Sequence, residues 1–294
     1  MTQQAMFVTE SPTATFLRAV SSSRREDLRN QIFASLEGCL FTSEVRVTSP
    51  GLVCGVAAAR SKAEGLGCVV LSEMKDGDFT LNTQHPVLCM RGPAKAIAMA
   101  EDCVPGAIAK FSGIARAARQ AQELAGSRVR VVSGAAKKMP EEVKAQVRRA
   151  IHCGGGSNCI SDRPFLYLDK NYVRMFGGVR QTLAAVSVMQ GYVRVIQLRG
   201  LMEDLASEAR AAIEMEAEIL MVDTGRLEDL DLVASMVRDM GKRKSTTIAF
   251  AGDIAMQEIP AIAAHDVDIL DVGRAIIDAP MVDIKVDVVA GEID

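Results

Sequence analysis

The carboxyl-terminal half of the chain alternates short apolar runs with longer amphipathic segments. Four of the runs are predicted as strands, at Val193–Leu198, Ile219–Val222, Thr246–Ala251 and Ile269–Val272. Each strand ends about 20–30 residues after the previous one, which is the length of one strand–helix unit. The repeat predicts parallel strands joined by helices, as in a (β/α) barrel, where function sits at the carboxyl ends of the strands.

Two further strands are predicted upstream of this repeat, at Arg128–Val132 and Phe165–Leu168. Between them, Pro140–Ile151 reads as a helix with proline in its first turn and two glutamates directly behind, which suits the helix dipole. Val179–Val188 is expected to be the next helix. These segments extend the strand–helix repeat towards the middle of the chain.

The region before residue 93 has shorter predicted elements, and they do not follow the strand–helix repeat. Glu44–Val47 and Pro86–Met90 read as strands, Ala57–Glu64 reads as a helix, and Asp76-Gly77-Asp78 is typical of a hairpin turn. This mixture predicts a small α/β sandwich ahead of the barrel.

Composition and charge exclude several classes of protein. Of 294 residues, 49% are hydrophobic and 24% are charged, so the chain can bury a full core. The longest uncharged stretches, Val47–Ala59 and Gln181–Val193, have 13 residues each, whereas a membrane span needs about 18 or more. A net charge of −3, 4% aromatic residues and no Trp argue against a nucleic-acid binder.

The cysteines and the first residues bear on the cellular compartment. Seven cysteines form no CxxC pair, and residues 1–16 lack the basic and apolar regions of a secretory signal. We therefore expect a cytoplasmic protein with reduced thiols. Its partners are expected to be a small-molecule substrate and further copies of the chain, with no nucleic acid and no membrane.

Two glycines follow directly on the last two predicted strands. Gly252 and Gly273 stand where barrels often hold a phosphate, because glycine lets backbone N–H groups approach an oxyanion closely. Tight strand-to-helix connections explain the same glycines equally well.

Several segments in order along residues 35–290 carry a family resemblance, among them the glycine-rich His152–Asn158 and the strand and turn Asp266–Gly273. These two resemble the CGGGxNHR and VDxISVGALT segments of the quinolinate phosphoribosyltransferase family. Three further stretches resemble its LSGIAT helix, its terminal ALDIS run and its amino-terminal domain: Phe111–Ala115, Ala279–Ile284 and Gly51–Gly55.

The resemblance implies a fold of the type II phosphoribosyltransferase kind, with an N-terminal α/β sandwich in residues 1–110 and an open α/β barrel of about seven parallel units in residues 111–294. The last strand of the sandwich could come from the carboxyl terminus. The resemblance also implies a homodimer or higher homo-oligomer, in which the sandwich contacts the barrel of the partner and both subunits build each active site.

The resemblance carries a set of site residues onto this sequence. Lys137 and Asp223 correspond to catalytic positions, and Asp223 to the ligand of a Mg²⁺ ion. Positions that correspond to substrate and phosphate binding are Asn158, Lys170, Gly252, Asp253, Gly273 and Arg274.

Several cations of the family are replaced in this chain. The arginine of its DTRKT segment is Ala136, and the His-Arg pair of NHR is Cys159-Ile160. The substrate-binding lysine of its IKDNH segment falls at or near Asp169, with Lys170 one place along, and an arginine that reaches across the dimer falls near Glu101–Cys103. Because buried carboxylates need paired positive charge, quinolinate itself fits this set poorly.

The predicted strand ends carry acids where the family binds phosphate and metal. Asp253 and Asp271 stand in the two phosphate segments, and no carboxylate in Ile196–Gly200 accompanies Asp223. Four arginines could supply the missing charge, or be ordinary solvated residues: Arg163, Arg174, Arg180 and Arg199.

Three hypotheses about the function remain open. The first is a phosphoribosyltransferase that acts on a small molecule other than quinolinate and releases pyrophosphate. The second is a barrel that has lost transfer chemistry and binds another small ligand or a protein partner. The third is a different reaction that uses Lys137, Lys170, Asp223 and Asp271 as polar groups.

Overall fold

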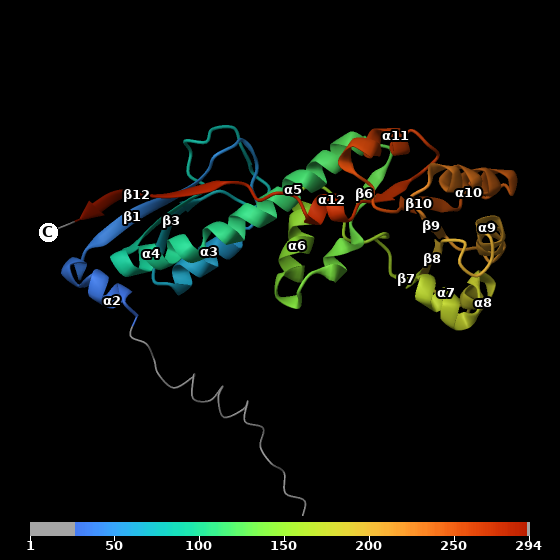
Figure 1. Ribbon diagram of the computed structural model, residues 1–294, viewed down its shortest axis with the longest axis horizontal. Helices are drawn as coiled ribbons and strands as arrows, with labels where there is room; N and C mark the ends of the chain where they lie inside the picture. The colour runs from blue at the N-terminus through green and yellow to red at the C-terminus, as the bar shows by residue number, and fades with distance from the viewer. Residues whose placement is uncertain (1–26, 293–294) are drawn as a thin grey trace, which may run out of the picture.

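A computed structural model describes residues 27–292 of the chain. It has an antiparallel sheet at one end and a parallel sheet at the other, with a long helix running from one to the other (Figure 1). The segment considered above for a secretory signal lies outside the described residues. Along residues 27–292, no helix combines the length and apolarity that crossing a membrane requires.

The antiparallel sheet has the strand order β12-β1-β5-β3. Its strands are β1 (Leu40–Val47), β3 (Val69–Glu73), β5 (Leu88–Pro93) and β12 (Ile284–Glu292). Helices α3 (Val56–Gly65) and α4 (Ala94–Cys103) pack on one face of this sheet. The alternating strand residues Val45 and Val47 are buried beneath them, so this part is the predicted two-layer sandwich.

Short elements complete this end of the molecule. They are α2 (Arg29–Ile32), the 3₁₀ turn η1 (Ala34–Leu36), β2 (Gly51–Leu52) and β4 (Phe79–Thr80). The turn at Asp76–Asp78 is present, but the strands on either side of it do not pair with each other, so the predicted hairpin is wrong. β3 pairs with β5, and β4 pairs with β2, because the chain leaves the main sheet after the turn.

Helix α5 (Pro105–Ala125) holds the two ends of the molecule together. It contacts α3 and α4 on one side and α6, α11 and α12 on the other. A Cβ added at Gly113 would lie 2.1 Å from the backbone oxygen of Pro280, so glycine is required where this helix meets the returning chain.

The parallel sheet has six strands within the described residues, in the order β6-β11-β10-β9-β8-β7. They are β6 (Arg130–Val132), β7 (Phe165–Leu168), β8 (Val193–Leu198), β9 (Ile219–Asp223), β10 (Thr247–Ala251) and β11 (Ile269–Asp271). β6 and β7 are the two edges, so the barrel is open as predicted, and its six described strands compare with the seven or so units that the resemblance implied.

Helices follow each of these strands. They are the 3₁₀ turn η2 (Gly134–Lys138), α6 (Glu141–Cys153), α7 (Lys170–Phe176), α8 (Val179–Ala185), α9 (Leu205–Glu214), α10 (Leu227–Asp239), η3 (Met256–Glu258), α11 (Ile259–Ala263) and α12 (Arg274–Ile277). α7 was not predicted from the sequence. It begins after Asp169, whose carboxylate accepts hydrogen bonds from the backbone N–H groups of Asn171 and Tyr172.

The last strand, β12, returns to the amino-terminal sheet and pairs with β1 along its whole length (Figure 1). The division of the chain at residues 110 and 111 falls inside α5, and we keep it as a proposal for how the two regions are bounded.

The barrel strands alternate between two packed layers. On β9, for example, Leu220 and Val222 face the helices, whereas Ile219 and Met221 face the barrel interior. The same alternation brings the last inward residues of several strands to the carboxyl-terminal rim.

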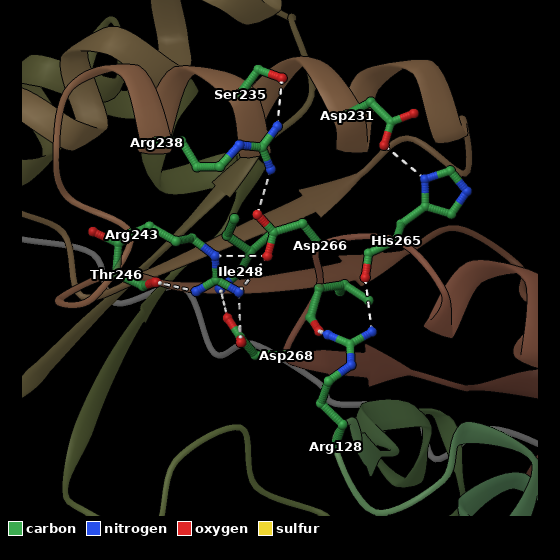
Figure 2. A network of polar contacts seen from close by, with 11 residues as sticks. Arg128, Asp231, Ser235, Arg238, Arg243, Thr246, Ile248, His265, Asp266 and Asp268 are labelled. Atoms are coloured by element: carbon green, nitrogen blue, oxygen red, sulfur yellow. Dashed lines mark hydrogen bonds and ion pairs between the residues drawn. The ribbon is translucent and has the colours of Figure 1, made fainter.

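The amino-terminal ends of β10 and β11 are closed by a network of charged groups (Figure 2). Arg243 donates to Asp266 and to Asp268 over 2.8 and 2.7 Å, and Arg238 donates to Asp266 as well. Asp268 in turn accepts from the backbone N–H of Ile248 over 2.7 Å. Asp266 and Asp268 therefore each have an arginine partner.

Candidate functional site

A cavity of about 460 Å³ opens at the carboxyl-terminal rim of the barrel. The strands deliver its side chains by their alternation, since Tyr167, Gln197, Asp223 and Asp271 all point inward from β7, β8, β9 and β11. The central strand β10 contributes only the small Ala251 to the cavity wall, which leaves the volume open.

A second cavity of about 190 Å³ adjoins the first and reaches deeper into the barrel. The two share Gly134, Lys137, Tyr167 and Asp271, so we treat them as two lobes of one site. The rim lobe is the larger one. The inner lobe is otherwise lined by Asn158 and by the apolar side chains of Val132, Ile160, Phe165 and Met221.

The rim lobe carries three cations and three carboxylates. Arg274 forms an ion pair with Asp253, and both side chains are largely exposed. Gln197 donates from its amide to Asp223, whose same oxygen lies 3.5 Å from Arg199. Lys137 and Lys138 form no ion pair with any residue in the described part of the chain, so they are available to an anionic ligand.

Asp271 differs from the other two acids in its surroundings. Its Oδ1 accepts a hydrogen bond of 3.0 Å from the backbone N–H of Gly134, and no group among residues 27–292 donates to its Oδ2. Burial raises the pKa of this carboxyl, and the Gly134 N–H and Lys137 oppose that rise only in part. Burial and the nearby Asp271 also raise the pKa of Tyr167, which keeps its phenol protonated.

Most of the predicted site residues meet at this site. Those lining the rim lobe are Lys137, Asp223, Gly252, Asp253, Gly273 and Arg274, and Asn158 lines the inner lobe. Lys170 lines neither lobe. It begins α7, where its backbone N–H donates to Gln197 over 2.7 Å.

The two glycines that were predicted to bind phosphate differ in whether packing requires a glycine at their position. A Cβ on Gly252 would lie 2.2 Å from the backbone nitrogen of Gly225, so the loops after β9 and β10 demand glycine there without any ligand. A Cβ on Gly273 would meet only Ala135, at an ordinary 3.6 Å. Packing therefore explains Gly252 but leaves Gly273 free for close approach to a ligand.

Of the four arginines considered as replacements, Arg199 alone forms an ion pair with a residue of this cavity, Asp223. Arg180 pairs with Glu214 on the outer helices, and Arg163 lines a separate hollow at the amino-terminal ends of the strands. At the replaced positions, Ala136 is buried in the core and Ile160 lines the inner lobe. The inner lobe therefore has one cation, Lys137.

Sequence reasoning missed Tyr167, Gln197 and Lys138 as site residues. The first two could have been found from strand alternation, because each follows inward apolar residues two positions apart on its strand. Lys138 gave no such signal, since it lies in the η2 turn, whose shape follows from the fold around it.

The resemblance implies a divalent metal at Asp223, and the donor set tests this. Among residues 27–292 no three or more ligating side chains come together in a way that could hold a metal ion. Asp223 is also engaged by the Gln197 amide, a donor that competes with a cation. The described residues alone therefore offer no preformed metal site, although Mg²⁺ often takes a single carboxylate together with substrate phosphates.

Comparison with known proteins places the chain in a family. The family model described as "Quinolinate phosphoribosyl transferase, C-terminal domain" matches residues 114–287, which is more than half of the chain. A probable nicotinate-nucleotide pyrophosphorylase [carboxylating] of Archaeoglobus fulgidus is 24% identical over 235 residues, covering 79% of this chain and 88% of that protein. The nicotinate-nucleotide pyrophosphorylase [carboxylating] of Homo sapiens is 24% identical over 287 residues, covering 96% and 94%.

Solved structures agree on the fold. The nicotinate-nucleotide pyrophosphorylase from Francisella tularensis superposes with a TM-score of 0.74 at 21% identity, covering 94% of this chain and 95% of that one. The enzyme of the same name from Pyrococcus furiosus gives a TM-score of 0.76 at 20% identity, covering 99% and 79%. With its sandwich, its open barrel and its matched carboxyl-terminal region, this chain belongs to the quinolinate phosphoribosyltransferase family.

Proposed function

We propose that this protein transfers a phosphoribosyl group from a pyrophosphate-bearing donor to a small-molecule acceptor other than quinolinate, with release of pyrophosphate. The observation that carries the proposal is the two-lobed cavity, whose rim lobe has cations and whose inner lobe is mostly apolar. Such a division fits a phosphorylated donor outside and a ring-shaped acceptor inside. Family membership supports the reaction class.

The rim lobe supplies the donor contacts in this proposal. Lys137 and Lys138 face the cavity without carboxylate partners among the described residues, and their charge would stabilise the departing pyrophosphate. Arg274 and the backbone beside Gly273 would hold the 5-phosphate. Asp223 would orient the ribose or contact a Mg²⁺ ion that arrives with the donor, and that ion would help neutralise the pyrophosphate.

The inner lobe argues against a dicarboxylate acceptor. Two carboxylates of one ligand would need at least two buried positive charges, and among residues 27–292 Lys137 is the one cation that lines this lobe. Asn158 is already committed to contacts with His152 and Cys159. Ile160 presents hydrocarbon to the lobe at the position where the family has the arginine of its NHR segment. An acceptor with one negative charge or none fits this lining.

A second candidate function is a barrel that binds another small ligand or a protein without transfer chemistry. The observation in its favour is the carboxylate content of the rim, since Asp223, Asp253 and Asp271 would lie near a bound phosphate. Like charges at short range cost free energy in a partly dry site. The affinity of the protein for the phosphoribosyl donor separates the two candidate functions, because only a transferase must bind that donor.

Calorimetric titration with phosphoribosyl pyrophosphate and Mg²⁺ tests the proposal. We expect binding at millimolar donor or below, and a loss of about 10-fold or more for Lys137→Ala, because it removes a charge-assisted contact. Lys62→Ala, on the exposed surface of α3, serves as the matched control and should bind like the unchanged protein. No heat of binding at millimolar donor would remove the transferase proposal and favour the second candidate.

Apolar side chains on the edge strands of the amino-terminal sheet bear on how the chain assembles. We propose a homodimer, because the amino-terminal sheet exposes Val69, Leu71, Val288 and Val289 on its edge strands. Light scattering at micromolar protein should give twice the monomer mass. A cytosolic location is proposed from the cysteine pattern of the sequence.

A further inference from the structure

Asp271 occupies the junction of the two lobes. It is the last residue of β11, it pairs in register with Ala251 of β10 and Val132 of β6, and it lines both lobes. Its Oδ1 is held by the Gly134 N–H, while its Oδ2 receives no hydrogen bond from residues 27–292. One oxygen is therefore fixed by the backbone, and the other is available to a ligand.

The groups around Asp271 set its character as an acid or base. Lys137 and Lys138 approach from η2, Tyr167 from β7 and Asp223 from β9. Burial and Asp223 raise the pKa of Asp271, and the Gly134 N–H and the two lysines lower it, with a net rise. A carboxylate of raised pKa takes up a proton more readily than an ordinary surface carboxylate.

The other polar groups of the junction and rim are less suited to accept a proton. Tyr167 stays protonated because its pKa is raised, and Lys137 is a cation. Asp223 is engaged by Gln197, and Asp253 is paired with Arg274. Asp271 is thus the carboxylate with an unoccupied oxygen that also faces the acceptor lobe.

This matters because acceptor nitrogens differ in whether they must lose a proton. A pyridine-type nitrogen attacks with an in-plane lone pair and gives up none. An azole also attacks through an in-plane lone pair, but its other ring nitrogen carries a hydrogen that must leave to give a neutral product. The nitrogen of a cyclic amide must lose its own hydrogen as the N–C bond forms. A base beside the acceptor serves only acceptors that carry such a hydrogen.

We propose that Asp271 is the general base for an uncharged N–H heterocycle, an acceptor that must lose a ring N–H proton when its nitrogen bonds to C1. This inference rests on the proposed transferase function. In the step, the nitrogen forms a bond to C1 of the phosphoribosyl group while the bond from C1 to the pyrophosphate oxygen breaks. The pyrophosphate departs with that electron pair, and the N–H proton passes to Oδ2 of Asp271.

The experiment compares two acceptor classes with phosphoribosyl pyrophosphate and Mg²⁺, with products identified by mass spectrometry. Imidazole, benzimidazole and uracil represent the N–H class, and nicotinate and quinolinate the pyridine class. We expect transfer to an N–H acceptor at least 10-fold faster than to either pyridine acid. Asp271→Asn should lower that rate about 100-fold or more, since general bases contribute on this scale, with donor affinity changed less than about 3-fold.

A rescue measurement separates catalysis from structural damage. Benzotriazole has a more acidic N–H than benzimidazole and needs less help to lose its proton. We expect Asp271→Asn to retain most of its rate with benzotriazole while losing it with benzimidazole. Asp239→Asn, an exposed residue at the end of α10, is the control for loss of a carboxylate and should match the unchanged protein with both acceptors.

The outcomes distinguish the two proposals. If the donor fails to bind, the transferase function falls, and this inference falls with it. If the donor binds but only pyridine acceptors react, or no N–H acceptor reacts, the inference is wrong while donor binding stands. Equal loss in Asp271→Asn with benzimidazole and benzotriazole would also overturn it, because a structural role predicts equal loss.

Discussion

Strand β11 has an acidic residue near each end, and their surroundings shift the pKa values of these two acids in opposite directions. Asp266, just before the strand, accepts hydrogen bonds from Arg243 and Arg238 (Figure 2). Burial alone would raise the pKa of Asp266, but these arginines outweigh it and lower the pKa. Asp271, at the other end, has one backbone N–H as its donor, and burial raises its pKa.

The difference shows which end of the barrel is built for stability and which for binding. At the amino-terminal end the charges satisfy one another within the fold. At the carboxyl-terminal end Asp271, Lys137 and Lys138 are left without full partners among the described residues, at some cost to stability. This matches the general division of (β/α) barrels into a stabilising face and a functional face.

The largest effect should follow from removing the central cation of the amino-terminal network. Arg243→Ala leaves Asp266 and Asp268 half-buried and short of positive charge, and should lower the free energy of unfolding by about 3 kcal/mol. Urea denaturation measures this. Lys242→Ala, which removes a more exposed ion pair next door, should cost less than about 1 kcal/mol. An equal loss of unfolding free energy in the two variants would show that the network stabilises the fold no more than an exposed ion pair does.

A smaller loss is expected from one acid of that network. Asp266→Asn keeps the shape but weakens two charge-assisted hydrogen bonds, and should cost about 1.5 kcal/mol at neutral pH. Because the folded-state pKa of Asp266 is lowered, its contribution is present above the unfolded-state pKa, near 3.8, and is lost as the pH falls through the folded-state value. Denaturation at pH 7 and at pH 3 should therefore show the difference narrowing in acid.

The same substitution at the other end of β11 should have the opposite sign. Asp271→Asn removes a partly buried carboxylate near Asp223 and keeps an oxygen for the Gly134 N–H, so stability should rise by about 1 kcal/mol at pH 7. The folded-state pKa of Asp271 is raised, so its unfavourable contribution develops as the pH rises from about 3.8 through the folded-state value. The gain should thus vanish in acid, and destabilisation at pH 7 would contradict the account.

The smallest effect on stability is expected at the rim. Arg274 and Asp253 are 67% and 63% exposed, so Arg274→Ala should change the free energy of unfolding by less than about 0.5 kcal/mol. Donor affinity should nevertheless fall, because the guanidinium faces the rim lobe. A stability loss near that of Arg243→Ala, with donor binding unchanged, would assign Arg274 to the fold and not to the site.

The sequence alone predicted the repeating part of the fold well. Strand ends at Leu198, Ala251 and the neighbourhood of Asp223 agree with the structure, because apolar period and glycine position are local signals. No local pattern marked β12, because its pairing with β1 joins residues more than 200 positions apart, and only the family resemblance suggested that a last strand of the sandwich comes from the carboxyl terminus. α7 was missed because Asp169 was compared with a ligand-binding position, whereas its carboxylate caps the helix.

The site was predicted in part for the same reasons. Asp223, Gly252 and Gly273 follow strand ends, where position along the chain is informative. Lys170 was placed one residue beyond a substrate position, but the start of α7 takes it out of the cavity. Tyr167 and Gln197 continue the alternation of inward residues on their strands, a signal that the sequence prediction did not use, whereas the availability of Asp271 required knowledge of its hydrogen-bond partners.

One competition experiment tests the central claim most directly. The protein is incubated with phosphoribosyl pyrophosphate, Mg²⁺ and equal concentrations of quinolinate and benzimidazole in one reaction. The products are identified by mass spectrometry. We predict a phosphoribosyl adduct of benzimidazole and none derived from quinolinate. A quinolinate-derived nucleotide as the main product would contradict the account.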